Sequence, residues 1–206
     1  MTALGLWLPA ALRGGRRRRR GAVNATLLAV SVLLTSSIGP LRAEETVSTA
    51  VATDRSVKAA FLYKFLAFVD WPQSAFLLPD TPLIIGVVGA DELAAELDQI
   101  TSGRTLNNHP ILIRRMRDGD TLAGLQVLFV GRTEATRLST IAARAAQRPI
   151  LTVTDLPGGL DQGMAITFVN TEGRVRFEIS VEAAERSGLK LSSRLLAVAQ
   201  AVRTGS

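Results

Sequence analysis

The sequence predicts an α/β fold: a single three-layer domain with a mostly parallel central sheet, a C-terminal β-hairpin and terminal helices. Two observations carry this prediction. Four short apolar runs of strand length recur along the chain, and helical segments alternate with them across short turns. The first run is continuous rather than alternating, which is typical of a strand covered on both faces. The expected strands are Leu83–Val88, Ile111–Met116, Gln126–Val130 and Pro149–Val153.

The first 43 residues have the layout of a secretory signal peptide. A basic run, Arg16–Arg20, precedes an apolar stretch, Ala25–Ile38, which is followed by Gly39-Pro40 and a small residue at Ala43. The apolar stretch is short and interrupted by polar side chains, which disfavours a membrane-spanning helix. We expect a periplasmic protein cleaved near Ala43, with a retained anchor as the alternative. Residues 44–54 are then a flexible lead-in to a domain over residues 55–206.

Charge and cysteine content exclude several classes of function. Removing the seven arginines of residues 1–43 from the 24 basic side chains leaves 17, against 18 acidic ones, so the mature chain has a net charge of −1. The basic character belongs to the signal, which argues against nucleic-acid binding. The chain contains no cysteine, which excludes thiol catalysis, thiolate metal sites and disulfide switching.

Half of the aromatic side chains lie in one segment, which is expected to be a helix over about Arg55–Val69 that stops before Pro72. The only charges of the run Val57–Pro72, on Lys58, Lys64 and Asp70, fall about 120° apart at helical spacing and form no polar face. Such a helix is buried in the protein, in a partner or in a membrane. Signal cleavage and the three charges disfavour the membrane. The aromatic residues of the segment are Phe61, Tyr63, Phe65, Phe68 and Trp71.

Two helices are expected between the strands. One covers Glu92–Ile100, with Asp91 as its N-cap after a Gly89-Ala-Asp91 turn. The other begins at Thr133 or Glu134 and runs to about Gln147. Together with the four strands they form the repeating strand–helix units of a parallel sheet.

The C-terminal part departs from the alternation of strands and helices. Ala165–Val169 and Arg174–Ser180 are expected to form a hairpin around Asn170–Gly173, with Gly173 at positive φ. Alternation along the second strand turns Val175, Phe177 and Ile179 to one side. A short helix over Val181–Ser187 and a last helix capped by Ser192 or Ser193 follow. The core side of the last helix is expected to carry Leu195, Leu196, Val198, Ala199 and Val202.

No catalytic or metal-binding set is found, and no cofactor is expected. His109 is the only histidine, in a loop-like segment where a solvated side chain is the ordinary interpretation. One histidine without cysteine makes a zinc site improbable. There is no G-x-S-x-G nucleophile elbow, and no carboxylate pair is placed to divide acid and base roles.

Three positions mark a small-ligand crevice at the carboxyl ends of the strands. Gly89 lies in a strand-to-helix turn, Arg115 near the end of the second strand, and Pro157 in a loop after the fourth. Ligands of parallel α/β sheets bind at this edge. The alternatives are a structural turn at Gly89, where Asp91 opposes a phosphate, a solvated strand end at Arg115, and a flexible connection at Pro157.

Several segments resemble the YfiR family of exported bacterial proteins. The specific ones lie near the two ends of the mature chain, and the resemblance runs from about Ser56 to Ala201. The matching segments are Val57–Phe65, Trp71-Pro72, Gly86–Gly89, Arg174–Ser180 and Ser187–Leu196.

The resemblance implies a periplasmic α/β regulator without enzymatic activity, commonly a homodimer. Its best-known relatives repress an inner-membrane diguanylate cyclase by binding the periplasmic domain of that enzyme, which lowers cyclic di-GMP and biofilm formation. Those relatives carry cysteine pairs linked to redox control, which this chain lacks.

Two functional hypotheses follow, with a hydrolase as a third and weakest. In the first, the protein holds a membrane signalling enzyme inactive through the aromatic segment and the charged row of the hairpin. The expected contact residues are Phe65, Phe68, Trp71, Arg174, Arg176 and Glu178. In the second, the protein binds a small molecule near Gly89, Arg115 and Pro157. A solvent-exposed strand face is the alternative for the charged row.

Overall fold

The computed structural model describes residues 41–205 apart from 77, 79 and 118, with side chains from residue 51 onward. Most of the expected signal peptide therefore lies outside the described residues. The helices are α1 Leu41–Phe65, α2 Asp91–Thr101, α3 Leu138–Ala145, α4 Val181–Arg186 and α5 Ser193–Ala197, and the 3₁₀ turns are η1 Gln73–Ala75, η2 Arg132–Arg137 and η3 Leu160–Gln162. The strands are β1 Val69–Asp70, β2 Leu83–Val88, β3 Thr105–Leu106, β4 His109–Met116, β5 Val127–Val130, β6 Leu151–Thr154, β7 Ile166–Thr171, β8 Arg174–Ser180, β9 Lys190–Leu191 and β10 Ala201–Arg203.

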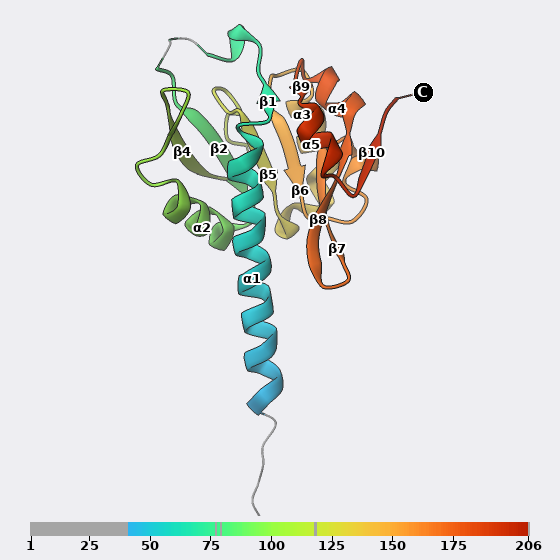
Figure 1. Ribbon diagram of the computed structural model, residues 1–206. Helices are drawn as coiled ribbons and strands as arrows, with labels where there is room; N and C mark the ends of the chain where they lie inside the picture. The colour runs from blue at the N-terminus through green and yellow to red at the C-terminus, as the bar shows by residue number, and fades with distance from the viewer. Residues whose placement is uncertain (1–40, 77, 79, 118, 206) are drawn as a thin grey trace, which may run out of the picture. The chain divides into compact units, whose positions relative to one another are not determined.

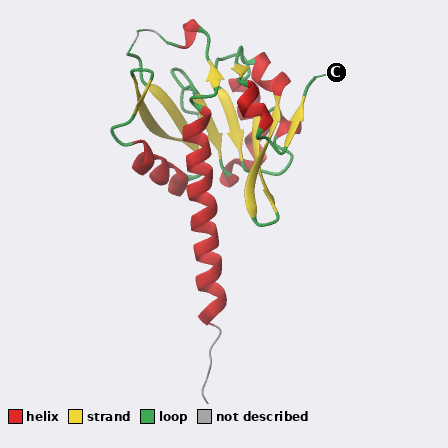
Figure 2. Ribbon diagram, viewed as in Figure 1, coloured by secondary structure: helices red, strands yellow, loops and turns green. Residues whose placement is uncertain are grey.

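The predicted α/β fold is confirmed. Eight strands of the described part form one sheet in the order β10-β8-β7-β6-β5-β2-β4-β3. Neighbours are parallel except in the pairs β7–β8 and β3–β4. Figure 2 shows the strands side by side, with helices in front of and behind them. No helix in the described part combines the length and apolar character needed to cross a bilayer.

Two apolar cores lie on the two faces of the sheet, which makes the three layers. Helices α1, α2, α4 and α5 contribute side chains to one core, together with Ile85, Phe129 and Phe177 of the sheet. Helix α3 contributes to the other, where Leu138 and Ile141 pack with Leu128. The strands are therefore covered on both faces, as their apolar composition indicates.

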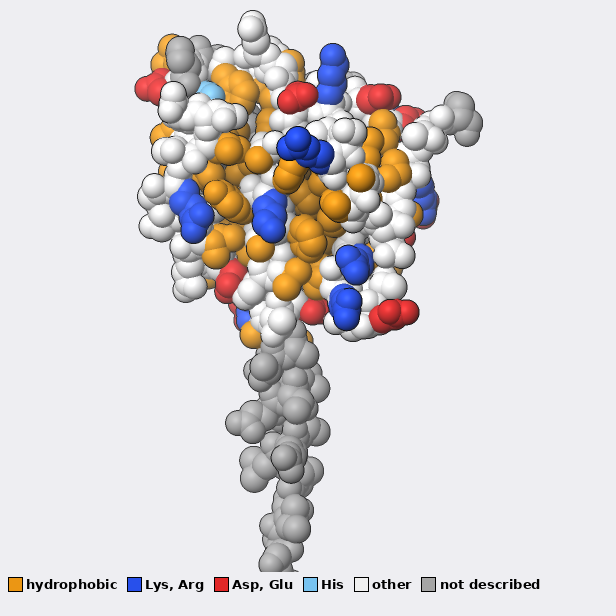
Figure 3. Space-filling view, in the orientation of Figure 1, with side chains coloured by type: hydrophobic (Ala, Val, Ile, Leu, Met, Phe, Trp, Pro, Cys, Tyr) orange, Lys and Arg blue, Asp and Glu red, His pale blue; other side chains and the backbone are white. Residues whose placement is uncertain are grey.

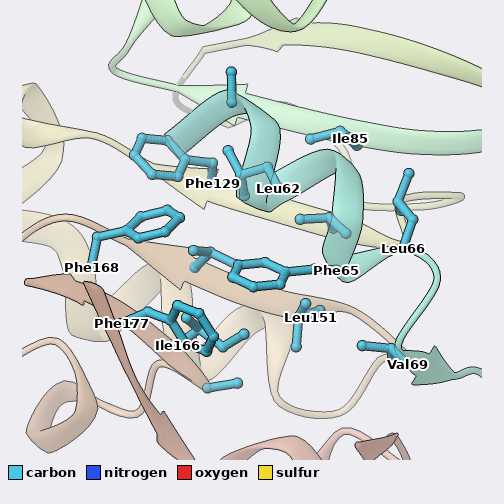
Figure 4. Close-up of a cluster of buried hydrophobic side chains, with 14 of the residues drawn as sticks. Leu62, Phe65, Leu66, Val69, Ile85, Phe129, Leu151, Ile166, Phe168 and Phe177 are labelled. Carbon is cyan, nitrogen blue, oxygen red and sulfur yellow. The ribbon is translucent and has the colours of Figure 1, made fainter. Parts of the chain in front are cut away.

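Helix α1 is the element that holds the first core together. Leu62 and Phe65 are almost fully buried, and Figure 4 shows the ring of Phe65 directed toward Phe168 and Phe177 of the hairpin. The ring centroids of Phe65 and Phe177 are 5.1 Å apart in an edge-to-face arrangement, a geometry favoured by the ring quadrupoles. The aromatic segment is thus buried mainly within its own domain.

The structure corrects both ends of this helix. It begins at Leu41 rather than near Arg55, so residues 44–54, expected as a flexible lead-in, are helical. It ends at Phe65 rather than Val69, because the chain turns there and Val69–Asp70 pairs with Leu191 and Lys190 of β9. Figure 1 shows α1 in front of the sheet, with β1 and β9 beside its C-terminal end.

Other boundaries also differ from the sequence prediction. Asp91 is the first residue of α2 rather than its cap, since Ala90 holds the N-cap position without a side-chain hydrogen bond. The helix expected from Thr133 or Glu134 starts as the 3₁₀ turn η2 and becomes α-helical only at Leu138. The last helix is capped by Ser192, one of the two predicted caps, and ends at Ala197.

Residues after α5 form a strand instead of helix. Strand β10 lies parallel to the second half of β8, with Val202 opposite Ile179. The side chains of Val198 and Val202, expected in the core, are 61% and 39% exposed. The hairpin itself is confirmed: β7 and β8 are antiparallel, and Gly173 has φ 73° in the turn between them.

The order of the strands creates a switch point between β2 and β5. From β2 the chain passes through α2, on the face that carries α1, to its neighbour β4. It then returns to the other side of β2 as β5 and passes through α3, on the opposite face, to β6. The connections thus diverge between the carboxyl ends of β2 and β5, which is where open α/β sheets form ligand crevices.

Candidate functional site

A crevice of about 350 Å³ lies at this switch point. Helix α1 forms one wall, and the residues that follow β2, β5 and β6 form the others. Its polar side chains in the described part are all charged, four of them acidic and three basic. The lining residues are Val51, Asp54, Arg55, Lys58, Gly89–Leu93, Phe129, Gly131, Arg132 and Asp155.

Two glycines let the floor of the crevice close. The N–H of Gly131, after β5, donates to the carbonyl oxygen of Val88 at 2.8 Å. A Cβ atom on Gly131 would lie 2.3 Å from the carbonyl oxygen of Gly89. Gly89 itself has φ 71°, a conformation that other residues rarely adopt. The turns after β2 and β5 therefore touch through backbone atoms, which brings their side chains to the same edge.

A partly buried cluster of charges joins α1 to this edge. Lys58 Nζ donates to Asp155 Oδ2 at 2.7 Å, and the two side chains are only 17% and 13% exposed. Arg132 Nε lies 3.6 Å from the same oxygen, although its side chain is 78% exposed. The other carboxylate oxygen, Asp155 Oδ1, is buried and accepts no hydrogen bond from the described residues.

Further polar contacts hold α1 at the rim. Arg55 forms an ion pair with Glu92 of α2. The hydroxyl of Ser56 donates to Glu96 Oε1 at 2.7 Å, and the amide of Asn170 in the hairpin contacts Asp54 Oδ2 at 3.4 Å. The crevice is thus bounded by charged groups of both signs, contributed by α1, α2 and the strand ends.

The ligand positions predicted from sequence are brought together only in part. Gly89 and Arg115 both line a second, larger cleft of about 680 Å³. Arg115 pairs there with Asp98 at 2.7 Å, both side chains being about half exposed. Pro157 is exposed and lines neither cleft. Gly89 belongs to both clefts.

Sequence reasoning missed the charged groups of the crevice. Gly131 and Asp155 follow directly after β5 and β6, so their positions at strand ends are a usable signal. The sequence signal for Lys58 is weaker, since it is only one of three charges in an otherwise apolar segment. Their meeting is a long-range contact, since Lys58 and Asp155 are 97 residues apart in the chain.

The predicted contact residues of the aromatic segment differ in exposure. Phe65 is 1% exposed and belongs to the core, so it is not available to a partner. Phe68 and Trp71 are half-buried and lie against the same core, as do Leu191 of β9 and Leu196 of α5. Figure 3 shows apolar side chains gathered across this face of the domain, with single basic side chains between them.

The charged row of the hairpin faces away from that core. Val175, Phe177 and Ile179 point into the core beneath α1, and by alternation Arg174, Arg176 and Glu178 leave β8 on its other face. The two expected halves of the contact surface are also at different ends. The hairpin turn contacts Asp54 through Asn170, whereas Trp71 follows the C-terminal end of α1 (Figure 1).

His109 is a structural residue rather than a solvated loop side chain. It begins β4, its ring stacks on Phe76 with centroids 4.6 Å apart, and Nδ1 lies 2.7 Å from the carbonyl oxygen of Thr81. These contacts tie the η1 segment to the sheet, and Gln126 adds a hydrogen bond to the carbonyl oxygen of Ala75.

Comparison with known proteins identifies the family. The YfiR/HmsC-like family matches residues 55–200, which include the sheet apart from β10, the hairpin and most residues of the crevice. No curated protein matches the chain. The family match contains both ends of the resemblance seen in the sequence, the aromatic segment and the hairpin with the helices after it. The chain therefore belongs to the YfiR/HmsC-like family.

Proposed function

We propose that this protein is an exported periplasmic regulator that binds the periplasmic domain of an inner-membrane diguanylate cyclase and represses it. Repression lowers cyclic di-GMP and with it biofilm formation. The observation that carries the proposal is the family match over residues 55–200. The signal-like layout of residues 1–43 supports export. A homodimer is part of the proposal, to be measured by light scattering of the purified protein.

The half-buried apolar side chains beyond α1 are the best-placed contact surface. Phe68, Trp71, Leu191 and Leu196 pack against the same core, and they lie in or next to the paired strands β1 and β9 or in α5. They are anchored by the core beneath, so they lose little side-chain freedom when a partner covers them. A central aromatic anchor of this kind contributes about 2 kcal/mol or more to binding.

The charged hairpin row is a separate candidate contact. Arg174 and Arg176 are exposed and Glu178 is half-buried on β8. Because the row and Trp71 lie on different faces and at different ends, one flat partner surface does not cover both. If both sets act, they bind separate parts of the partner or two different chains.

The test combines genetics with purified components. Deleting the gene is expected to raise cyclic di-GMP, and the exported protein is expected to co-purify with a membrane cyclase. Trp71→Ala is expected to weaken that complex about thirtyfold, which corresponds to 2 kcal/mol. Leu112→Ala is the matched control, since Leu112 is an exposed apolar side chain (48%) on β4 outside this surface. Unchanged cyclic di-GMP in the deletion strain, with no cyclase co-purifying, would overturn the proposal.

Small-ligand binding is a second candidate function, favoured by one observation. A polar crevice stands at the switch point, the place where sheets of this topology bind ligands. Binding there is compatible with repression, because a ligand that prefers one conformation of α1 shifts the regulator toward it. A thermal-shift screen of the exported protein tests this function, and a uniformly null screen would contradict it.

A further inference from the structure

The three bases of the crevice are already paired, which restricts the ligand it accepts. Lys58 and Arg132 share the carboxylate of Asp155, and Arg55 pairs with Glu92, whereas the lining acids Asp54 and Asp91 are in no such pair within the described residues. An anionic ligand has to compete with the paired carboxylates, and a cationic ligand at Asp155 has to compete with Lys58 and Arg132. Breaking a largely desolvated pair is costly because it leaves the other charge unpaired. A neutral ligand avoids that cost.

Hydrogen-bonding capacity nevertheless remains in the same cluster. A lysine ammonium has three donors, and the structure shows one of them used by Asp155. Asp155 Oδ1 accepts no hydrogen bond from the described residues. It is covered as the side chain stands, but Oδ2, which accepts from Lys58, keeps a further lone pair that a ligand group can use.

A donor and an acceptor therefore stand next to each other, 2.7 Å apart, beside a second base. A hydroxyl group both donates and accepts, so two neighbouring hydroxyls satisfy such a pair together: one donates to the carboxylate and the other accepts from the ammonium. Arg132, with its exposed side chain, is placed to donate to a further hydroxyl.

We propose that the crevice binds a neutral polyhydroxylated molecule of monosaccharide size, held by Lys58, Arg132 and Asp155. The proposal rests on the second function above, ligand binding, and specifies its chemistry. The volume of about 350 Å³ lies at the lower end of small-molecule sites. Because Lys58 belongs to α1 and Asp155 follows β6, the bound molecule ties the helix to the strand ends.

The experiment measures binding and its location together. The exported protein is titrated by calorimetry with D-glucose, D-galactose, D-ribose and myo-inositol, and in parallel with L-glutamate, inorganic phosphate and putrescine. At least one of the neutral compounds is expected to bind and to slow amide hydrogen exchange of residues 51–58. Arg132→Gln is expected to weaken that binding about tenfold through a lost charged hydrogen bond. Lys58→Met is expected to abolish it.

Controls separate the possible outcomes. Arg186→Gln removes an exposed arginine from a surface pair on α4 and is expected to leave binding unchanged. Arg132→Gln keeps the test valid if Lys58→Met does not fold, because the Arg132 side chain is 78% exposed. Binding of only a charged compound would overturn this proposal and leave ligand binding standing. Binding of no compound would overturn both, and sugar binding unaffected by Arg132→Gln would place the site elsewhere and overturn this proposal.

Discussion

Two consecutive segments of helix α1, Val51–Lys58 and Ala59–Phe65, are attached to the domain by different forces. From Ala59 to Phe65 the helix is held by apolar burial, with Leu62 0% and Phe65 1% exposed. From Val51 to Lys58 it is held by ion pairs and hydrogen bonds, and Val51 is 56% exposed. Apolar burial is not screened by salt, whereas charge pairs near the surface weaken as ionic strength rises. One helix therefore has a fixed end in the core and an adjustable end at the crevice.

The largest effect is expected at the fixed end. Phe65→Ala removes a fully buried ring that contacts Phe168 and Phe177, and is expected to lower the free energy of unfolding by about 4 kcal/mol. Urea denaturation followed by circular dichroism measures it. Lys64→Ala, on the exposed side of the same turn, is the control and is expected to change stability little. Similar losses for the two variants would contradict core anchoring.

The next largest loss of stability is expected in the segment of α1 at the crevice. Lys58→Met leaves Asp155 without its closest base in a largely buried position, at a cost of about 3 kcal/mol. Replacing both members, as Lys58→Met with Asp155→Leu, is expected to recover most of this loss, because no charge is then left unpaired. The same denaturation experiment applies, and a double variant as unstable as the single one would show that the pair is not the cause.

A smaller effect is expected from the floor of the crevice. Gly131→Ala places a Cβ atom against the carbonyl of Gly89 and forces the turns after β2 and β5 apart. Its backbone angles, φ −88° and ψ 179°, suit alanine, so any loss is steric and is expected to be about 2 kcal/mol. Unchanged stability would mean that the two turns separate without cost.

The smallest expected effect is a difference in salt dependence between residues 51–58 and residues 59–65 of α1. Raising salt is expected to speed amide hydrogen exchange in residues 51–58 severalfold while leaving residues 59–65 unchanged, because only the first group is held by charges. Mass spectrometry of exchange in the intact protein resolves the two segments. An equal change of exchange rate in the two segments would contradict the inference that only residues 51–58 are held by charges.

The sequence was sufficient for six of the eight strands of the sheet in the described part, because these strands are locally encoded. The first strand was placed at Leu83–Val88 and the second hairpin strand at Arg174–Ser180, as the structure has them. Continuous apolar runs and strict alternation are both visible within the segment itself. The same holds for Gly173 and the Ser192 cap, whose roles depend on adjacent residues.

The errors arose where distant residues decide the local structure. Residues 198–202 carry a helical apolar pattern, but the open edge of β8 takes Ala201–Arg203 as a strand. The crevice shows the same limit of local prediction. Gly89 was identified from its turn, whereas the pair of Lys58 and Asp155 joins distant segments and exists only after folding. The contact surface was overextended to Phe65 because apolarity on all sides does not reveal which side the core takes.

Trp71 has a practical consequence for following this molecule. The chain contains two tryptophans, and the other, Trp7, lies in the expected signal peptide. Once that segment is removed, all indole emission comes from one half-buried ring beside β9, whose Nε1 has no acceptor among the described residues. The exported protein then carries a built-in optical probe at the proposed docking surface, and covering that ring shifts its emission without any added label.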